Sequence, residues 1–168
     1  TELSVWNLRH ALIEQGIPSM LDKAENRPHI SLAGFSNTDC DILISLVQEY
    51  ANDIEPFDVQ LGSIGTFPTD ENVLFLSPVP TLQLLTHHQE FHNRLAKSKL
   101  VSSLYYVPTN WIPHCSVKMN IPDEQLQKAI EFCSKTFKPI IGQFQEIGIV
   151  EFQPIKHLAM WPLIAKVR

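Results

Sequence analysis

The chain has 168 residues, of which 44% are apolar, and its 18 acidic and 13 basic side chains give a formal net charge of −5. This size and apolar content suit one domain, or two small lobes that share a core, and we expect a single two-lobed domain over residues 1–168. The acidic balance argues against binding to long duplex nucleic acid, whereas a small or terminal phosphate ligand remains compatible with it.

Cysteine usage and hydropathy predict the cellular setting. The three cysteines are far apart in sequence and sit in apolar surroundings, which is typical of reduced thiols in a cytoplasmic protein. No apolar run approaches the roughly 18 to 20 residues of a membrane span, and the first nine residues lack the pattern of a signal peptide. We therefore expect a cytoplasmic protein with no membrane partner.

The first half of the chain shows helical periodicity, then alternation, then turn-forming residues. It predicts a helix over 3–15, a strand over 28–32, a helix capped by Asn37 or Thr38 that reaches about Asn52, and a hairpin of 57–64 and 72–76 around a turn at 68–71.

The second half repeats this order. It predicts a helix from Pro80 and Thr81 to about Ala96, a strand that ends near Met119, a helix from Pro122 to about Phe137, and strands at 143–152 and 156–167 with a turn at 153–154. The repeated order of helix, strand, helix and hairpin indicates an internal duplication. Strands that return by hairpins, with helices on one face, predict an α+β fold with antiparallel sheets.

A short phrase, Pro-His-x-Ser followed by an aliphatic residue, occurs once in each half, at residues 28–32 and 113–117. Successive side chains of a strand point to opposite faces, so the histidine and serine of each copy share one face and the apolar residues share the other. The polar pairs are His29 with Ser31 and His114 with Ser116. Two imidazoles and two hydroxyls in one polar cleft would suit proton transfer around a phosphate.

The flanks of the two motifs extend this pattern. Arg27-Pro-His-Ile-Ser-Leu is followed by the hairpin sequence Val59-Gln-Leu-Gly-Ser-Ile-Gly-Thr-Phe-Pro, and the second motif has the lead-in Tyr106-Val-Pro-Thr-Asn-Trp-Ile-Pro. Over about residues 3 to 165 the chain resembles the two-histidine (2H) phosphoesterase superfamily, and within it the bacterial 2′-5′ RNA ligase and cyclic phosphodiesterase group. The resemblance implies two lobes related by a pseudo-twofold axis, with helices on the outer faces and both motifs in a central cleft.

The resemblance also implies a reaction that needs no metal or other cofactor, namely cleavage of a cyclic phosphate or a 2′-5′ linkage in a nucleotide or at an RNA end. Histidines can hold or release a proton near neutral pH. We assign His114 as the base and His29 as the acid, and the pseudo-symmetry allows these roles to be exchanged. Ser31 and Ser116 would donate hydrogen bonds to the nonbridging phosphoryl oxygens.

Several neighbouring residues have two interpretations. By strand parity Lys118 either contacts the phosphate or lies at a solvated strand end, whereas for Arg27 a structural role is favoured over a place in the cleft. Trp111, Tyr106 and Phe67 are candidates to stack on a nucleobase, with core packing as the alternative. Core packing is favoured for Tyr105.

Two other function classes stay open. One is a non-catalytic protein that binds RNA ends or nucleotides. The other is a metallohydrolase that uses His88 and His92, which are four residues apart on a predicted helix, although a solvated helix face is favoured for them. Family members usually begin with a strand, which is not evident here, so we expect a monomer, or a dimer if another chain supplies that strand.

Overall fold

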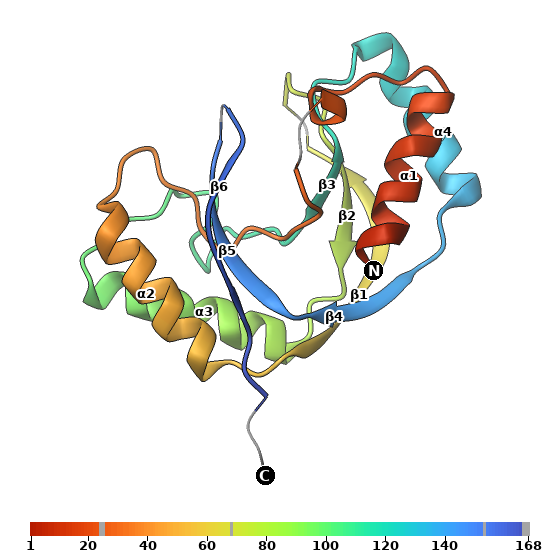
Figure 1. Ribbon diagram of the computed structural model, residues 1–168. Coiled ribbons are helices and arrows are strands. Elements are labelled where there is room, and N and C mark those ends of the chain that lie inside the picture. The colour runs from red at the N-terminus through yellow and green to blue at the C-terminus, as the bar shows by residue number, and fades with distance from the viewer. Residues whose placement is uncertain (24–25, 68, 153, 166–168) are drawn as a thin grey trace. The chain divides into compact units, whose positions relative to one another are not determined.

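The computed structural model describes residues 1–23, 26–67, 69–152 and 154–165 (Figure 1). The chain forms two compact units, and each unit is built from three separate segments. Unit 1 contains Thr1–Ile30, Val59–Val79 and His114–Gly142, and unit 2 contains Ser31–Asp58, Pro80–Pro113 and Gln143–Arg168. The chain therefore passes from one unit to the other within the first motif, and again directly before the histidine of the second motif.

Unit 1 combines helices with most of a four-stranded sheet. Its helical elements are α1 (Glu2–Glu14), the 3₁₀ helix η1 (Met20–Lys23) and α4 (Asp123–Thr136), and the sheet contains β1 (Phe57–Thr66), β2 (Leu74–Pro78), β3 (Cys115–Lys118) and β4 (Ile140–Phe144). The strand order is β3-β2-β1-β4, and β2 is antiparallel to both of its neighbours. Helices α1 and α4 lie side by side in Figure 1, where Lys128 of α4 donates a hydrogen bond to the carbonyl of Gln15.

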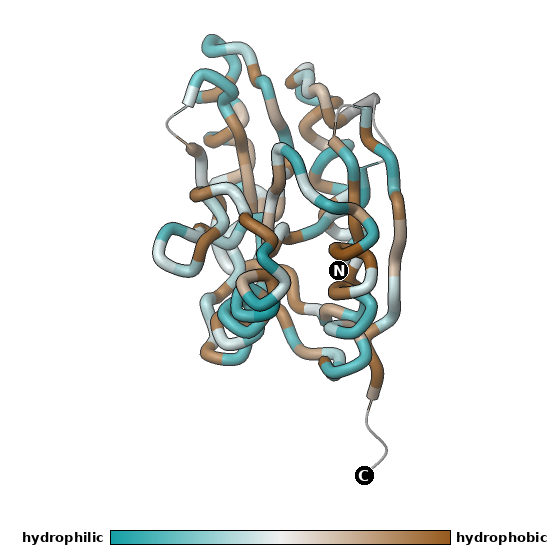
Figure 2. The backbone as a smooth tube through the Cα atoms, turned by 90° about the vertical axis from the view of Figure 1, so that its left-hand side faces the viewer, coloured by the Kyte–Doolittle hydropathy of each residue, from teal (hydrophilic) through white to brown (hydrophobic). Residues whose placement is uncertain are grey.

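Unit 2 packs two helices against a hairpin. The helices are α2 (Cys40–Asp53) and α3 (Leu82–Lys97), and the antiparallel hairpin is β5 (Glu146–Glu151) with β6 (Lys156–Pro162). The core shared by these elements consists of Leu43, Leu46, Val47, Tyr50, Ala51, Ile54, Phe91, Leu95 and Leu163. Figure 2 shows brown and teal residues interleaved along the helices, as expected for elements that bury one face.

Most predicted elements are confirmed, with small corrections. The α2 cap is Asp39, whose carboxylate accepts hydrogen bonds from the Asp41 and Ile42 amides, and not the predicted Asn37 or Thr38. The strand predicted over 143–152 is two strands, because β4 ends at Phe144 and β5, which pairs with β6 in a separate sheet, begins at Glu146. Parts of the predicted turns, at Pro68 and Gln153, and the predicted strand end at Val167 lie outside the described residues.

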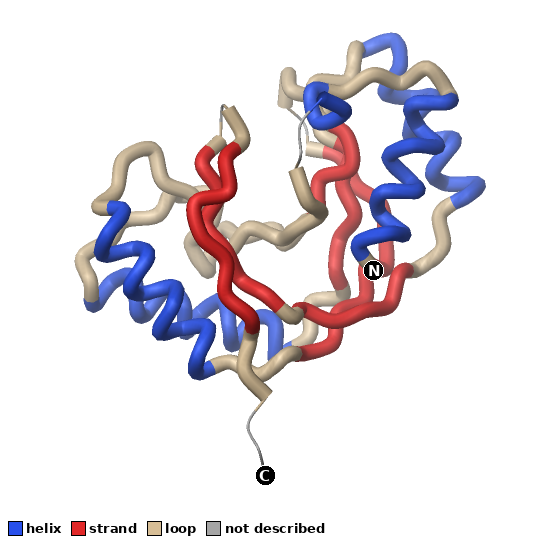
Figure 3. Tube along the Cα trace, in the orientation of Figure 1, coloured by secondary structure: helices blue, strands red, loops and turns tan. Residues whose placement is uncertain are grey.

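The strand predicted for the first motif is wrong, because none of residues 26–35, all of which are described, belongs to a strand. Figure 3 draws this segment as a loop. Backbone carbonyls of a strand accept hydrogen bonds from a neighbouring strand, but here several of them accept hydrogen bonds from side chains instead. The pairs are Arg9 to Asn26, His29 to Arg27, Trp111 to Ser31, and both His88 and His92 to Leu32.

The helices also bear on the question of a membrane partner. Across the residues that the structure describes, no helix combines the length and the apolar character that a membrane crossing requires.

Candidate active site

His29 and His114 belong to the same unit, and their segments adjoin there. The Cys115 thiol, next to His114, hydrogen bonds to the His29 backbone. Burial raises the pKa of this thiol to about 11, while the nearby Arg9 charge and that hydrogen bond act in the opposite direction. The thiol is therefore protonated at neutral pH and serves as a packing group between the two motifs.

The ring of His29 is oriented by its own backbone. Its Nδ1 lies 2.7 Å from the Arg27 carbonyl oxygen, and the side chain is exposed. Because a carbonyl oxygen can only accept a hydrogen bond, Nδ1 carries a proton and donates a hydrogen bond to the Arg27 carbonyl. This bond can persist whether the ring is neutral or charged, so Nε2 is the ring atom at which a second proton would be gained or lost.

His114 lies directly before β3 and packs against two aromatic rings. Its ring and that of Phe67 are nearly perpendicular, with centroids 4.8 Å apart, and the ring of Phe75 of β2 lies at 5.5 Å. Phe67 and Phe75 also contact each other at 4.4 Å. Phe67, a candidate for base stacking, thus lies beside His114, where it limits the orientations of the imidazole ring.

Arg9 is the residue that sequence reasoning missed. It is only 3% exposed, and its guanidinium donates from Nη1 to the Asn26 carbonyl at 2.6 Å and from Nη2 to the Ser116 carbonyl at 2.7 Å. One side chain of α1 thereby joins the segment before the first motif to the serine of the second. The sequence did carry a signal for the burial of Arg9, because the helical spacing places Arg9 on the same face as Val5 and Leu12, which are also buried.

Strand parity holds in the second motif as far as Val117. Cys115 and Val117 are buried and Ser116 is half-buried, as alternation predicts. The register with β2 then shifts, because Phe75 pairs with Ser116 whereas the adjacent Leu74 pairs with Lys118. Val117 is therefore the extra residue of a β-bulge, and such a bulge re-aims the residues that follow.

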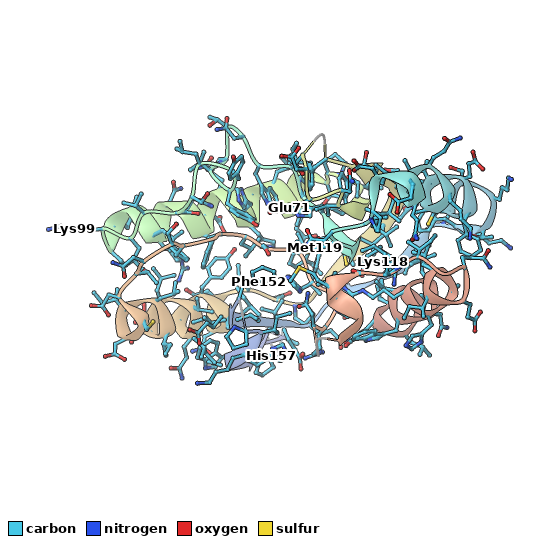
Figure 4. All side chains as sticks on the ribbon, turned by 90° about the horizontal axis from the view of Figure 1, so that it is seen from above. Glu71, Lys99, Lys118, Met119, Phe152 and His157 are labelled. Carbon is cyan, nitrogen blue, oxygen red and sulfur yellow. The ribbon has the colours of Figure 1, made fainter. Side chains whose placement is uncertain are left out.

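The bulge changes the place of Lys118, which is labelled with Met119 in Figure 4. Its side chain is 0% exposed, so the solvated strand end considered from the sequence is wrong. Contact with a phosphate stays a prediction that would require local opening of the structure around Lys118.

Arg27 forms an ion pair with Glu2 of α1. Its Nε and Nη2 donate to the two carboxylate oxygens of Glu2 at 3.1 and 2.9 Å, and this hydrogen bonding lowers the pKa of Glu2. This paired geometry agrees with the structural role that the sequence favoured for Arg27.

Ser31 lies in unit 2, where the end of the first motif meets the lead-in of the second. Nε1 of Trp111 donates to the Ser31 carbonyl oxygen at 3.0 Å, and the Leu32 side chain packs against the unit 2 core. One face of the Trp111 indole is covered by His88, with ring centroids 3.7 Å apart and planes 6° apart. A nucleobase stacked on Trp111 would have to use the other face.

The solvated face favoured for His88 and His92 is wrong. His88 is 2% exposed, and Nε2 of each ring lies 3.0 Å from the Leu32 carbonyl oxygen, to which each donates. Within the described part of the chain, no group of three or more His, Cys, Asp or Glu side chains has an arrangement that could hold a metal ion.

We expect His88 to make unit 2 sensitive to acid. Burial, helped by the neighbouring His92, lowers the pKa of His88 from 6.5 to about 4, so between these values the unfolded chain takes up a proton that the folded chain does not. The free energy of unfolding should therefore fall as pH drops from about 6.5 to about 4, by up to about 3 kcal/mol. Urea unfolding at a series of pH values measures this, and His88→Phe should flatten the dependence in that window. Parallel curves for the two proteins would contradict the prediction.

The adjacent residues Tyr105 and Tyr106 differ in burial. The Tyr106 ring packs over Gly34, where an added Cβ would lie 2.8 Å from Cε2 of the ring. Tyr105 is 83% exposed, so the core packing favoured from the sequence is wrong for it. Tyr105 therefore displays an aromatic face close in sequence to the second motif.

A separate open groove lies between α2 and α3 in unit 2. Its volume is about 660 Å³, and its lining includes Glu49, Arg94 and Lys97. None of the site residues predicted from the sequence lines it. The groove therefore adds nothing to the candidate site.

Known proteins resemble this chain over much of its length. The profile of the family described as the 2′-5′ RNA ligase superfamily matches residues 8–153. A Bacillus mycoides (strain KBAB4) protein named "Putative phosphoesterase" is 28% identical over 101 residues, which cover 58% of this chain and 55% of that protein, so the match spans about half the length of the relative.

A solved structure has the same fold. A chain described as "Crystal structure of phosphoesterase" matches with a TM-score of 0.59 and 15% identity, and the match covers 95% of this chain and 92% of the other. The match of the family profile to most of the chain, which includes both histidine motifs, establishes the relationship that the motifs indicated. The chain belongs to the 2′-5′ RNA ligase superfamily, within the two-histidine phosphoesterases.

Proposed function

We propose that the protein is a phosphoesterase that opens 2′,3′-cyclic phosphates of nucleotides or RNA ends, or cleaves 2′-5′ linkages, by acid-base catalysis between His29 and His114. The observation that carries this proposal is that the two histidine segments adjoin within unit 1, with Nδ1 of His29 engaged by its own backbone. Family membership supports the same chemistry.

In the proposed reaction a water molecule attacks the phosphorus of the cyclic diester. Nε2 of one neutral histidine, assigned to His114, takes the proton of the water as the new P–O bond forms. The bond between phosphorus and one ribose oxygen breaks, and the protonated His29 gives a proton to the departing oxygen. The product is a phosphomonoester, and the two histidines have exchanged protonation states.

The two serines would stabilise the charge that builds on the nonbridging oxygens. Ser116 follows His114 on β3, and its carbonyl is held by Arg9. Ser31 follows His29 by two residues, and chain geometry keeps their Cα atoms within about 7 Å of each other. This connection supports a role for Ser31 without any assumption about how the units are arranged.

The aromatic residues around the motifs are proposed to hold the nucleoside. Tyr105 displays its ring to solvent, and Trp111 has one face free of His88. Stacking on such rings tolerates any base, so we expect weak discrimination between bases and strong dependence on the phosphate.

The proposal predicts hydrolysis that survives chelation. The purified protein is incubated with 2′,3′-cyclic nucleotides, a cyclic phosphate of ADP-ribose and a 2′-5′-linked dinucleotide, each with and without EDTA, and products are separated by chromatography. We expect turnover of at least one substrate at an unchanged rate in EDTA, because both proton transfers use imidazole.

Other outcomes point to the rival classes. Loss of turnover in EDTA and its return with zinc would overturn the proposed mechanism in favour of a metallohydrolase. Saturable binding of a substrate without turnover, measured by calorimetry, would instead favour a protein that only binds RNA ends or nucleotides.

A further inference from the structure

Three side chains of unit 2 converge on two consecutive carbonyl oxygens of the first motif. Trp111 donates from Nε1 to Ser31, and His88 and His92 each donate from Nε2 to Leu32, all at 3.0 Å. Each oxygen thus meets a donor that comes from a distant part of the sequence. The indole of Trp111 and the neutral imidazole of His88 bring no net charge with their hydrogen bonds.

The donors form one packed cluster. The His88 ring is stacked on Trp111 at 3.7 Å and lies 4.5 Å from the ring of His92. His88 is 2% exposed and also lies by the backbone of Tyr106, and burial keeps its pKa at about 4. At neutral pH the ring is therefore uncharged, and the stack can present fixed N–H groups.

Holding these two carbonyls determines how the Ser31 side chain is presented. The peptide unit between Ser31 and Leu32 is planar, so a hydrogen bond to its oxygen orients the whole unit, and the bond to Leu32 orients the next one. The Leu32 side chain is anchored in the unit 2 core as well. With the backbone fixed on this side, the Ser31 hydroxyl keeps only the choice among the staggered rotamers of χ1.

We propose that His88, His92 and Trp111 are positioning residues, which fix the backbone of the first motif so that the Ser31 hydroxyl meets the phosphate. None of the three is assigned a contact with the reacting atoms. This inference rests on the proposed function, because it concerns the serine of that site. It also gives the helix α3 histidines, which the acid-base mechanism does not use, a role in turnover.

The first test replaces Trp111 by phenylalanine, which keeps an aromatic ring against His88 and removes the Nε1–H donor. We expect kcat to fall by about 10-fold to 100-fold, since small misplacement of a group that contacts the transition state costs rates of this order. KM should change little, because phenylalanine can still stack on a base, and the pH profile of kcat should change little, because His29 and His114 are intact. Trp161→Phe, an indole lost from β6 in the same unit, is the matched control and should keep full activity.

The second test asks whether the effect passes through Ser31. In a Ser31→Ala background, Trp111→Phe should produce no further loss of kcat, because the group that it positions is already absent. His92→Gln, whose amide nitrogen can still donate to Leu32, should retain more activity than His92→Leu.

The outcomes separate the inference from the proposed function. Suppose that the wild-type protein turns over a phosphodiester, but that Trp111→Phe lowers kcat by the same factor with and without Ser31→Ala. The positioning role is then wrong and the proposed function stands. A rise in KM alone for Trp111→Phe would also overturn positioning and would leave stacking on the base as the only role of Trp111. If wild type turns over none of the substrates, the proposed function itself fails.

Discussion

Alanine at His114 or at His29 should lower kcat by about 10²-fold to 10⁴-fold on any phosphodiester that the protein cleaves. Each substitution removes one of the two groups that move protons in the transition state, and general acid-base catalysis contributes rates of this size. Steady-state kinetics on the best substrate measures the loss. We expect the double variant to be little slower than either single variant, because groups that act as a unit are not additive.

His10→Ala is the matched control for this experiment. His10 is an exposed residue of α1 in the same unit, where its ring stacks on Trp6. It should retain wild-type kcat, and circular dichroism should show all variants to be folded. Full activity in either His29→Ala or His114→Ala would contradict shared acid-base catalysis.

Replacing Arg9 by methionine should lower the free energy of unfolding by about 3 to 5 kcal/mol. The side chain gives two charge-assisted hydrogen bonds to carbonyls, each worth about 1.5 to 3 kcal/mol, and methionine would leave both oxygens unbonded by this residue. Asn26, whose carbonyl accepts one of these hydrogen bonds, is also buried, so water cannot readily replace the guanidinium there. Urea unfolding followed by tryptophan fluorescence provides the measurement.

Arg27→Met is the comparison for Arg9, since Arg27 also comes from unit 1 and pairs with Glu2. The Arg27 and Glu2 side chains are 43% and 41% exposed, and exposed pairs contribute at most about 1 kcal/mol. Equal losses in the free energy of unfolding for Arg9→Met and Arg27→Met would contradict the prediction, because the buried hydrogen bonds of Arg9 would then contribute no more than an exposed ion pair.

Local patterns in the sequence were sufficient for the helices and for the second motif. Helical spacing of apolar residues predicted α1, α2, α3 and α4 to within a few residues, because a helix is built from contacts three and four positions apart. Strand parity predicted the burial of Cys115 and Val117. It failed at Lys118, since a bulge depends on pairing with β2 and not on residues within β3.

The first motif shows where local reasoning ends. Its sequence matches the second, yet only the second forms a strand, and in the first the Ser31 and Leu32 carbonyls are bonded by side chains. The donors lie far away along the chain, such as Trp111, which is 80 residues from Ser31. Nothing in five residues of sequence can specify such a partner. The same applies to His88, whose burial depends on Trp111 stacked against it.

By itself the sequence determined the α+β class, the order of most elements and the family, and it predicted the two histidines and two serines that we propose for the site. These features are carried by short-range periodicity and by a motif repeated 85 residues apart, from His29 to His114. Only the tertiary structure decided that both histidines lie in one unit, that Arg9 joins their segments, and that Trp111 and the α3 histidines hold the backbone around Ser31. The reason is physical: hydrogen bonds between residues 17 to 107 positions apart form only after the chain has folded, and local sequence does not encode which donor each carbonyl will meet.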